Sequence, residues 1–459
     1  MKFLAPRLSL LPATLLLSVL GACGGGGGNG ASAPVPQPPP PAPPATPAPT
    51  ISNISPATAI LTRPTDFEVT GTDLGDGMRF QLAGCVATEA AGGGKTRRVF
   101  SCTPSGTAGE YPLQLYASAA TTSSLASKTV TYLTPVAKVG EVNRKLAVLK
   151  EDGSLWVWEN DWDKSTTGNV VTINTRLGSN YTDIEAGSAF GMAIDADGGL
   201  WAWGYNNDGV FAEGPPAGSP TPVQIGKDYA KVAAKGAHTS GGERVVGLKR
   251  DGGLWAWGAR SSPVPESPSA QLIPHQFGSG FSDLATGTAG NSMALKADGS
   301  LWSWNENISP TPFVPTKSGD GYQTVVSAYD AHYGIKKNGE LWAWGRNAIK
   351  RDQAASDDTP VLVGPGYASL SAGSYYVMAL KADGTLWGFG SNSEGQFGDG
   401  TSRGGGPVQS ASGVRKVWAG DSCTVIEKRD GTLWATAFCT LGATTSGPLF
   451  YGFRRLPQY

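Results

Sequence analysis

Very few residues in this chain have the types and spacing that catalysis requires. Residues 400–404 read GTSRG and match the G-x-S-x-G pattern of a serine nucleophile. That motif works only on a strand-to-helix turn with a histidine base nearby. Here it lies in a glycine-rich stretch of a β-rich chain whose only histidines are His238, His275 and His332. We therefore expect no nucleophilic catalysis at Ser402.

Phosphate and metal sites are equally weak. The segment EAAGGGKT ends in Gly94-Lys95-Thr96, but a phosphate-binding loop would need glycine at position 89, which is Glu89. The sequence DADG at 195–198 offers too few oxygen ligands for calcium. The chain has no Cys-x-x-Cys pair and no histidines at ligand spacing. We expect neither a metal nor a cofactor.

The N-terminus has the features of an export signal. Lys2 and Arg7 precede an apolar run, Leu8–Leu20, which is shorter than a membrane-spanning helix. Leu20-Gly21-Ala22-Cys23 then resembles the lipobox of bacterial lipoproteins, which implies cleavage before Cys23 and a lipid on its thiol. The alternative is an ordinary signal peptide. The resemblance implies an envelope protein that meets the membrane through this lipid, and Gly24 favours the outer membrane.

We expect residues 1–22 to be the signal peptide and residues 23–50 to be a linker. The linker is rich in glycine and proline, and such a composition cannot bury a core. Over the whole chain of 459 residues, 36 basic residues balance 37 acidic ones. No basic patch indicates a nucleic-acid partner.

The remaining cysteines are even in number. Once Cys23 is set aside, sequence proximity favours the pairs Cys85–Cys102 and Cys423–Cys439 in an oxidising compartment.

Residues 51–134 contain short alternating runs such as DFEVTGTDL and EYPLQLYA, separated by turn residues. This pattern predicts a small β-sandwich. Its opening, PTISNISPATAILTRPTDFEVTGTDL, resembles the immunoglobulin-like domains of plexins and transcription factors. Such domains serve as spacers or interaction modules.

The rest of the chain is repetitive. Seven segments of the type LKADGTLWGFG recur every 40 to 54 residues. Asp-Gly or Asn-Gly between apolar runs predicts a hairpin with a type I′ turn. The turn residues are Asp152, Gly153, Asp197, Gly198, Asp251, Gly252, Asp298, Gly299, Asn338, Gly339, Asp383, Gly384, Asp430 and Gly431.

The tryptophans of these segments alternate along the strand with other apolar residues, so both faces of the strand must be covered. A blade between two neighbouring blades provides that environment, and the rings would fill the wedge between blades. We predict an all-β protein with a seven-bladed β-propeller over residues 135–459 after the N-terminal sandwich.

The repeats resemble those named for the regulator of chromosome condensation. The segment SAGSYYVMALKADGTLWGFGSNSEGQFGDGT is the fullest copy, whereas Ala328 and Thr436 depart from the pattern. The resemblance implies the propeller fold. The nucleotide exchange and chromatin binding of the namesake do not suit an exported protein, so we transfer neither.

Function is expected at a propeller face, in the loops that follow the LWAWG strands. Aromatic and arginine side chains are common anchors at such surfaces. The candidate residues are Trp162, Tyr205, Asn206, Asp208, Arg260, Asn305, Arg346 and Asn392. We predict a monomeric protein-binding or scaffold module without catalysis. The alternatives are an inhibitor of a secreted or periplasmic enzyme and a propeller that binds or degrades polysaccharide.

Overall fold

The structure is a computed structural model of the chain. It describes residues 47–142, 145–161, 171–187, 189–206, 208–212, 215, 217–235, 243–258, 274–286, 291–305, 314–329, 331–345, 359–436 and 451–456. Within these ranges every regular element is a β-strand, and no helix is found that could cross a bilayer. Residues 48–459 form one compact unit, and Cys23 with residues 1–46 lies outside the described part.

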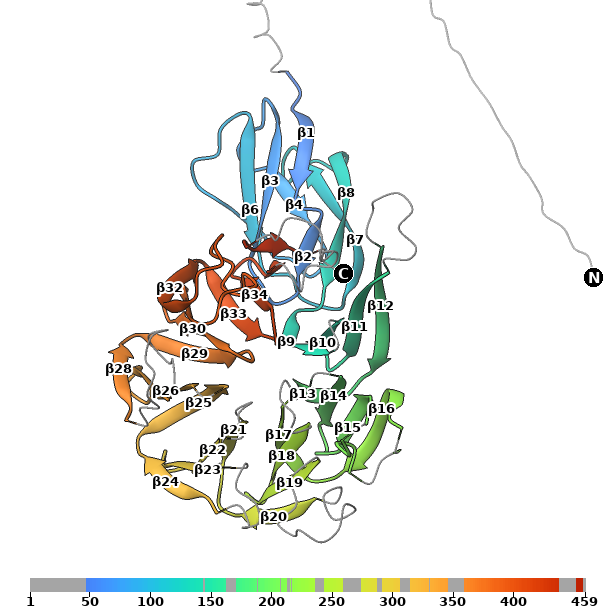
Figure 1. Cartoon of the computed structure of the whole chain (residues 1–459). Coiled ribbons are helices and arrows are strands. Elements are labelled where there is room, and N and C mark those ends of the chain that lie inside the picture. Colours follow the sequence, from blue (N-terminus) through green and yellow to red (C-terminus); the bar gives the residue numbers. More distant parts are fainter. Residues whose placement is uncertain are drawn as a thin grey trace, which may run out of the picture. The chain divides into compact units, whose positions relative to one another are not determined.

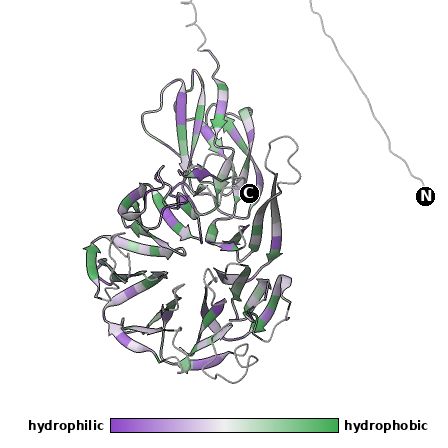
Figure 2. Cartoon of the chain, in the orientation of Figure 1, coloured by the Kyte–Doolittle hydropathy of each residue, from purple (hydrophilic) through white to green (hydrophobic). Residues whose placement is uncertain are grey.

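The N-terminal part of this unit consists of two four-stranded sheets. One sheet has the order β1-β3-β6-β5 and the other β2-β8-β7-β4. The strands are β1 (Thr50–Ser55), β2 (Thr58–Ile60), β3 (Thr65–Thr72), β4 (Arg79–Gln81), β5 (Thr88–Glu89), β6 (Arg97–Cys102), β7 (Gly109–Tyr116) and β8 (Ser124–Leu133). In Figure 2 hydrophobic and hydrophilic residues both occur along these strands, as expected for sheets with one buried face.

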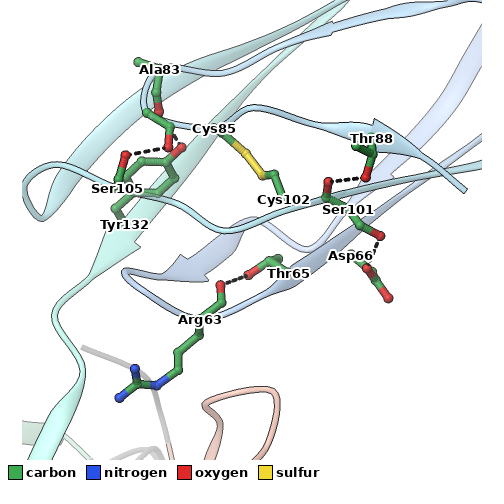
Figure 3. Close-up of a disulfide and its surroundings, with 11 residues drawn as sticks. Arg63, Thr65, Asp66, Ala83, Cys85, Thr88, Ser101, Cys102, Ser105 and Tyr132 are labelled. Carbon is green, nitrogen blue, oxygen red and sulfur yellow. Dashed lines mark hydrogen bonds between the residues drawn. A yellow bond between two sulfur atoms is a disulfide. The ribbon is translucent and has the colours of Figure 1, made fainter.

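The two sheets enclose a single core. Phe67, Val69, Leu113 and Leu115 are fully buried in it. A disulfide joins Cys85 to Cys102, the last residue of β6, with their Cα atoms 5.6 Å apart. Figure 3 shows this bridge close to Tyr132, whose hydroxyl donates a hydrogen bond to the carbonyl of Ala83. Burial, with a smaller contribution from Tyr111, raises the pKa of Tyr132 to about 12. The disulfide and this bond fix the loop between β4 and β5 to the core.

The remaining described strands form seven four-stranded antiparallel sheets, which follow one another in chain order (Figure 1). We number them sheet 1 to sheet 7. Sheet 1 contains β9 (Val136–Val142), β10 (Lys145–Lys150), β11 (Leu155–Asp161) and β12 (Val171–Gly178); sheet 2 contains β13 (Tyr181–Ala186), β14 (Phe190–Asp195), β15 (Leu200–Gly204) and β16 (Ser219–Gly226). Sheet 3 contains β17 (Tyr229–Lys235), β18 (Arg244–Lys249), β19 (Leu254–Gly258) and β20 (His275–Gly278); sheet 4 contains β21 (Asp283–Thr286), β22 (Asn291–Leu295), β23 (Leu301–Asn305) and β24 (Thr316–Gly319).

Sheet 5 contains β25 (Tyr322–Ala328), β26 (Ala331–Lys336), β27 (Leu341–Gly345) and β28 (Val361–Gly364); sheet 6 contains β29 (Tyr367–Ala372), β30 (Tyr376–Lys381), β31 (Leu386–Gly390) and β32 (Gly405–Ala411). Sheet 7 contains β33 (Val414–Ala419), β34 (Thr424–Lys428), β35 (Leu433–Ala435) and β36 (Arg454–Arg455). The first strands of all seven sheets line one central channel, which is the arrangement of a β-propeller.

The hairpin turns between the second and third strands differ from the sequence prediction. A type I′ turn needs positive φ at both central residues, but only the glycine has it, with 78° at Gly153 and 90° at Gly384. In sheet 1 the Gly153 N–H donates to the carbonyl of Lys150, and the Lys150 N–H donates to that of Ser154. This is a three-residue loop, a type I turn followed by a left-handed glycine. The type I′ prediction was wrong because the loop is one residue longer.

In most sheets the residue after the turn glycine accepts a hydrogen bond from the first tryptophan of the repeat. In sheet 6 the Trp387 Nε1–H donates to the Thr385 hydroxyl over 3.1 Å, and that hydroxyl donates to Asp383 over 2.7 Å. Serine or threonine makes the same relay in sheets 1 and 7, and in sheet 4 the Ser300 hydroxyl accepts from Trp302 while the Ser300 N–H donates to Asp298. Glu340 accepts from Trp342 in sheet 5, and Asp195 accepts from Trp201 in sheet 2. The turn thus both reverses the chain and supplies the partner that a half-buried indole requires.

Sheet 3 differs, because its post-turn residue is Gly253. Among the residues that the structure describes, no hydrogen-bond acceptor contacts the buried Nε1 atom of Trp255. The ring is still covered on one face, because Lys249 Nζ lies 4.3 Å from its centroid.

The sandwich contacts the ring where sheets 1 and 7 meet. The Arg63 guanidinium pairs with Glu151 of the sheet 1 turn over 2.5 Å and lies 3.5 Å from the buried carboxylate of Glu427 in β34. Arg415 also pairs with Glu427, over 2.9 Å, and Lys416 with Glu151, over 3.4 Å. These charges compensate one another in a partly buried cluster that links the sandwich to sheets 1 and 7.

Candidate functional site

The predicted binding face carries the loops that follow the third strand of each sheet. Three of its predicted residues, Trp162, Arg260 and Arg346, lie outside the described residues, and Asn305 is placed only as the last residue of β23. Tyr205 directly follows β15 and is 58% exposed, as a contact residue should be. Asp208 is half-buried and accepts a hydrogen bond from the Glu243 N–H over 2.8 Å.

Asn206 and Asn392 have a different role from the predicted one. They are 7% and 1% exposed, respectively. The Asn206 amide donates to the Pro215 carbonyl, and its oxygen accepts from the Phe211 N–H, each over 2.9 Å. Asn392 makes the equivalent bond to the Phe397 N–H over 2.8 Å. Both side chains therefore hold their own loops, and we reassign them from partner contact to loop support.

A cavity opens on this face between sheets 5 and 6. It has a volume of about 520 Å³, within the range of small-molecule sites. Its walls come from the end of β25, the turn before β30 and the loop after β31. Serines, glycines and tyrosines make up most of the lining.

Two tyrosines form the aromatic wall of this cavity. The rings of Tyr329 and Tyr375 lie 4.9 Å apart between centroids with an interplanar angle of 35°. Tyr329 has φ of 53°, a left-handed conformation that is strained for a large side chain. Tyr375 is 43% exposed, and burial of the rest, followed by the nearby Tyr329 and Asp421, raises the pKa of its hydroxyl. The Tyr375 phenol is therefore a neutral hydrogen-bonding group at physiological pH.

The described residues that line the cavity offer uncharged polar groups. Among the described residues that line it, none is a carboxylate, lysine, arginine or histidine. Ser391, Ser393 and Ser402 present hydroxyl groups, while Gly404 and Gly405 present backbone instead of side chains. Ser402, the serine of the GTSRG motif, lies on this wall.

The central channel is a second candidate and is charged. Its volume is about 290 Å³. Lys138 bridges Asp183 and Glu185 over 2.9 and 3.3 Å. Burial lowers the pKa of Lys138, but the two carboxylates outweigh that effect and raise it overall. These charges pair across sheets 1 and 2 and stabilise the ring. Among the described residues, no group of three His, Cys, Asp or Glu side chains could hold a metal ion.

Sequence reasoning missed the tyrosine cavity. Tyr329 and Tyr375 stand 46 positions apart, outside the LWAWG segments that the repeat pattern emphasises. The available signal was positional: both tyrosines occur between the first and second strands of successive repeats. Neighbouring blades place such equivalent positions side by side.

The comparisons with known proteins agree with the repeat architecture. A model of the regulator of chromosome condensation (RCC1) repeat matches residues 181–210 and 367–396, the segments that contain Asn206 and Asn392. The fold is similar to that of Prp20p from Saccharomyces cerevisiae, with 17% identity and a TM-score of 0.50 over 60% of this chain and 77% of that chain. That structure was described with the binding of Prp20p to Gsp1p and histones.

The structure of human WBSCR16 is also similar, with 15% identity and a TM-score of 0.50 over 63% of this chain and 85% of that chain. The chain therefore carries RCC1-type repeats, and it shares the fold of RCC1-type propeller proteins.

Proposed function

We propose that this protein is a lipid-anchored component of the bacterial cell envelope whose propeller binds a protein partner and catalyses no reaction. In this proposal the propeller has seven blades, the N-terminal sandwich is an immunoglobulin-like spacer, and the lipid on Cys23 attaches both to the outer membrane. The observation that carries the binding role is the exposed aromatic surface of the loop face, where Tyr205 and Tyr375 stand on a closed ring of sheets. Exposed aromatic side chains on a rigid scaffold are common anchors of protein interfaces.

The fold similarity supports this reading only by analogy. Prp20p, which shares the fold, was described as binding Gsp1p and histones, both proteins. The partner of this chain must differ, because the sequence has an export signal and no basic patch. Fold alone does not identify a partner.

The binding role is tested by capture followed by reconstitution. The full-length protein, cross-linked in intact cells of the producing bacterium, is purified and its attached proteins are identified by mass spectrometry. The purified partner is then titrated against the wild type and against Trp162→Ala/Tyr205→Ala. We expect one-to-one binding that weakens at least tenfold in the double variant.

A matched control is Val86→Ala, which removes a side chain that is 91% exposed on the sandwich. It should bind like the wild type. Equal binding by all three proteins would show that the interface does not include Trp162 and Tyr205. The absence of any reconstituted complex would refute the binding role. The anchor is tested separately, because Cys23→Ser should release the protein from the membrane fraction and abolish metabolic labelling with palmitate.

A further inference from the structure

We propose that the cavity between sheets 5 and 6 binds one neutral sugar unit of a glycan, with the sugar ring against Tyr375 and its hydroxyl groups toward Ser391 and Ser402. This inference concerns the concave site between the two sheets rather than the exposed surface around Tyr205, and Tyr375 is the residue that it shares with the protein-binding proposal.

The aromatic wall provides the first argument. The face of an aromatic ring carries partial negative charge, and the C–H groups on one face of a sugar carry partial positive charge. Tyr375 is 43% exposed and is supported from one side by Tyr329 at 4.9 Å. A half-exposed ring with a fixed orientation is a platform for a flat, partly apolar ligand.

The neutral polar groups provide the second argument. A hydroxyl both donates and accepts hydrogen bonds, so serine and tyrosine side chains match the hydroxyl groups of a sugar in either sense. A charged ligand would lose its hydration in this cavity without meeting an opposite charge on the described lining residues. Carboxylate, phosphate and ammonium ligands are therefore disfavoured.

Backbone geometry leaves the space open. Gly405 has φ of 124°, which L side chains rarely adopt, and a Cβ built on it meets no atom within 4 Å. At Gly404 a Cβ would lie 2.6 Å from the Gly390 carbonyl oxygen. A side chain is thus excluded at both positions, so the backbone forms this wall and a ligand can approach it closely.

The cavity is also built before any ligand arrives. Ala328 and Ala331, on either side of the strained Tyr329 turn, are 3% and 9% exposed. The Ser391 N–H donates to the Tyr375 carbonyl over 2.9 Å and joins the two loops that form the walls. Such preorganisation lowers the cost of binding a small ligand. An extended peptide would instead pair with a free strand edge. Beside the cavity, β25 is already paired with β26, and β30 with β31.

The test is a titration of the full-length protein, purified in a detergent without a sugar headgroup. The probes are maltohexaose, cellohexaose and chitohexaose as neutral glycans, oligogalacturonate as a charged glycan and a ten-residue proline peptide. Isothermal titration calorimetry gives affinity for each. The variants are Tyr375→Ala, Tyr375→Phe and the control Tyr205→Ala, which removes an exposed tyrosine of the same face outside the cavity. Near-ultraviolet circular dichroism verifies the fold of each variant.

We expect at least one neutral glycan to bind with a micromolar to millimolar Kd and oligogalacturonate to bind at least tenfold more weakly. Tyr375→Ala should lose at least tenfold in affinity, whereas Tyr375→Phe and Tyr205→Ala should change it less than threefold. The proposal is overturned if no neutral glycan binds, if the charged glycan or the proline peptide binds more tightly, or if Tyr375→Ala binds like the wild type. If Tyr375→Ala does not fold, Ser402→Leu, which places a larger apolar side chain on the opposite wall of the cavity, replaces it with the same expected loss.

Discussion

Replacing Gly253 with serine should stabilise the ring, because it supplies the acceptor that the buried Nε1 of Trp255 lacks. In the sheets that have the relay, serine or threonine at this position accepts from the indole over 2.8 to 3.1 Å. A hydrogen bond of this kind contributes about 1 kcal/mol net. Gly253 is not among the residues with positive φ, so removing the glycine also restricts the unfolded chain, which adds about 0.5 kcal/mol.

The cost of the new side chain is small. A Cβ at position 253 would lie 2.9 Å from the amide nitrogen of Gln276, the end of a flexible side chain that can move. It would also lie 3.0 Å from Asp251 Oδ1 and 3.1 Å from Trp255 Nε1, so both side chains must shift slightly to accept it. We therefore expect a net gain of about 1 kcal/mol and a rise of about 2 °C in Tm for a unit of this size.

The measurement is urea unfolding followed by tryptophan fluorescence, with Gly253→Ala as the matched control. Alanine provides the same Cβ and nearly the same backbone restriction but no acceptor, so the difference between the two variants isolates the hydrogen bond. The free energy of unfolding of Gly253→Ser should exceed that of Gly253→Ala by about 1 kcal/mol. If serine is no more stable than alanine, the relay does not stabilise the fold and the reasoning fails. Thr385→Val should cause the reverse change in sheet 6, a loss of about 1 to 3 kcal/mol.

Three further outcomes are expected. The Thr385 hydroxyl and N–H hold the pKa of Asp383 below its ordinary value of 3.8. The stability that Asp383 contributes is therefore present above pH 3.8 and is lost as the pH falls through its lower pKa in the folded protein. Asp383→Asn should flatten the decline of the urea midpoint below pH 4, and an unchanged slope would contradict this role. Arg63→Ala should lower the free energy of unfolding by about 1 to 3 kcal/mol, whereas Arg97→Ala, which removes an exposed ion pair, should have a clearly smaller effect. Equal effects in urea unfolding would mean that the buried cluster adds nothing beyond a surface pair. Removing the bridge with Cys85→Ser and Cys102→Ser should lower stability of the sandwich by about 3 kcal/mol, and a loss under 1 kcal/mol would show that the loop is fixed by other contacts.

The repeat pattern predicted the architecture well because each blade is specified by short-range sequence features. An Asp-Gly turn, an alternating apolar strand and a fixed period are each visible without knowledge of tertiary contacts. The class of turn was missed because the extra residue of the loop, which precedes the Asp-Gly or Asn-Gly pair, is a glutamate, alanine, arginine or lysine, and the sequence pattern does not show that it belongs to the loop. The relay was also visible as the serine or threonine between glycine and leucine, but its meaning depends on where the indole nitrogen points.

The candidate site was predicted less well, since a surface depends on which side chains remain exposed. Asparagine in a loop is equally suited to contact a partner or to hold the loop. Asn206 and Asn392 are buried, which shows that they hold their loops. Tyr205 could be identified because it follows a strand end. The pair Tyr329 and Tyr375 joins two repeats, and no pattern within one repeat reveals it.

The connectivity of the ring determines the order in which its parts can form. Each of the seven sheets is one continuous stretch of chain, and the first and last sheets share no strand. During synthesis each sheet can therefore form as soon as its own residues have emerged, but the side of sheet 1 that packs against sheet 7 stays uncovered until sheet 7 has been made. Its Val136 and Val139 pack with Leu433 of β35 and with Leu456, which directly follows β36. A nascent chain that stalls before residue 414 thus exposes an apolar flank on its oldest sheet, and it depends on chaperones or rapid completion to avoid aggregation.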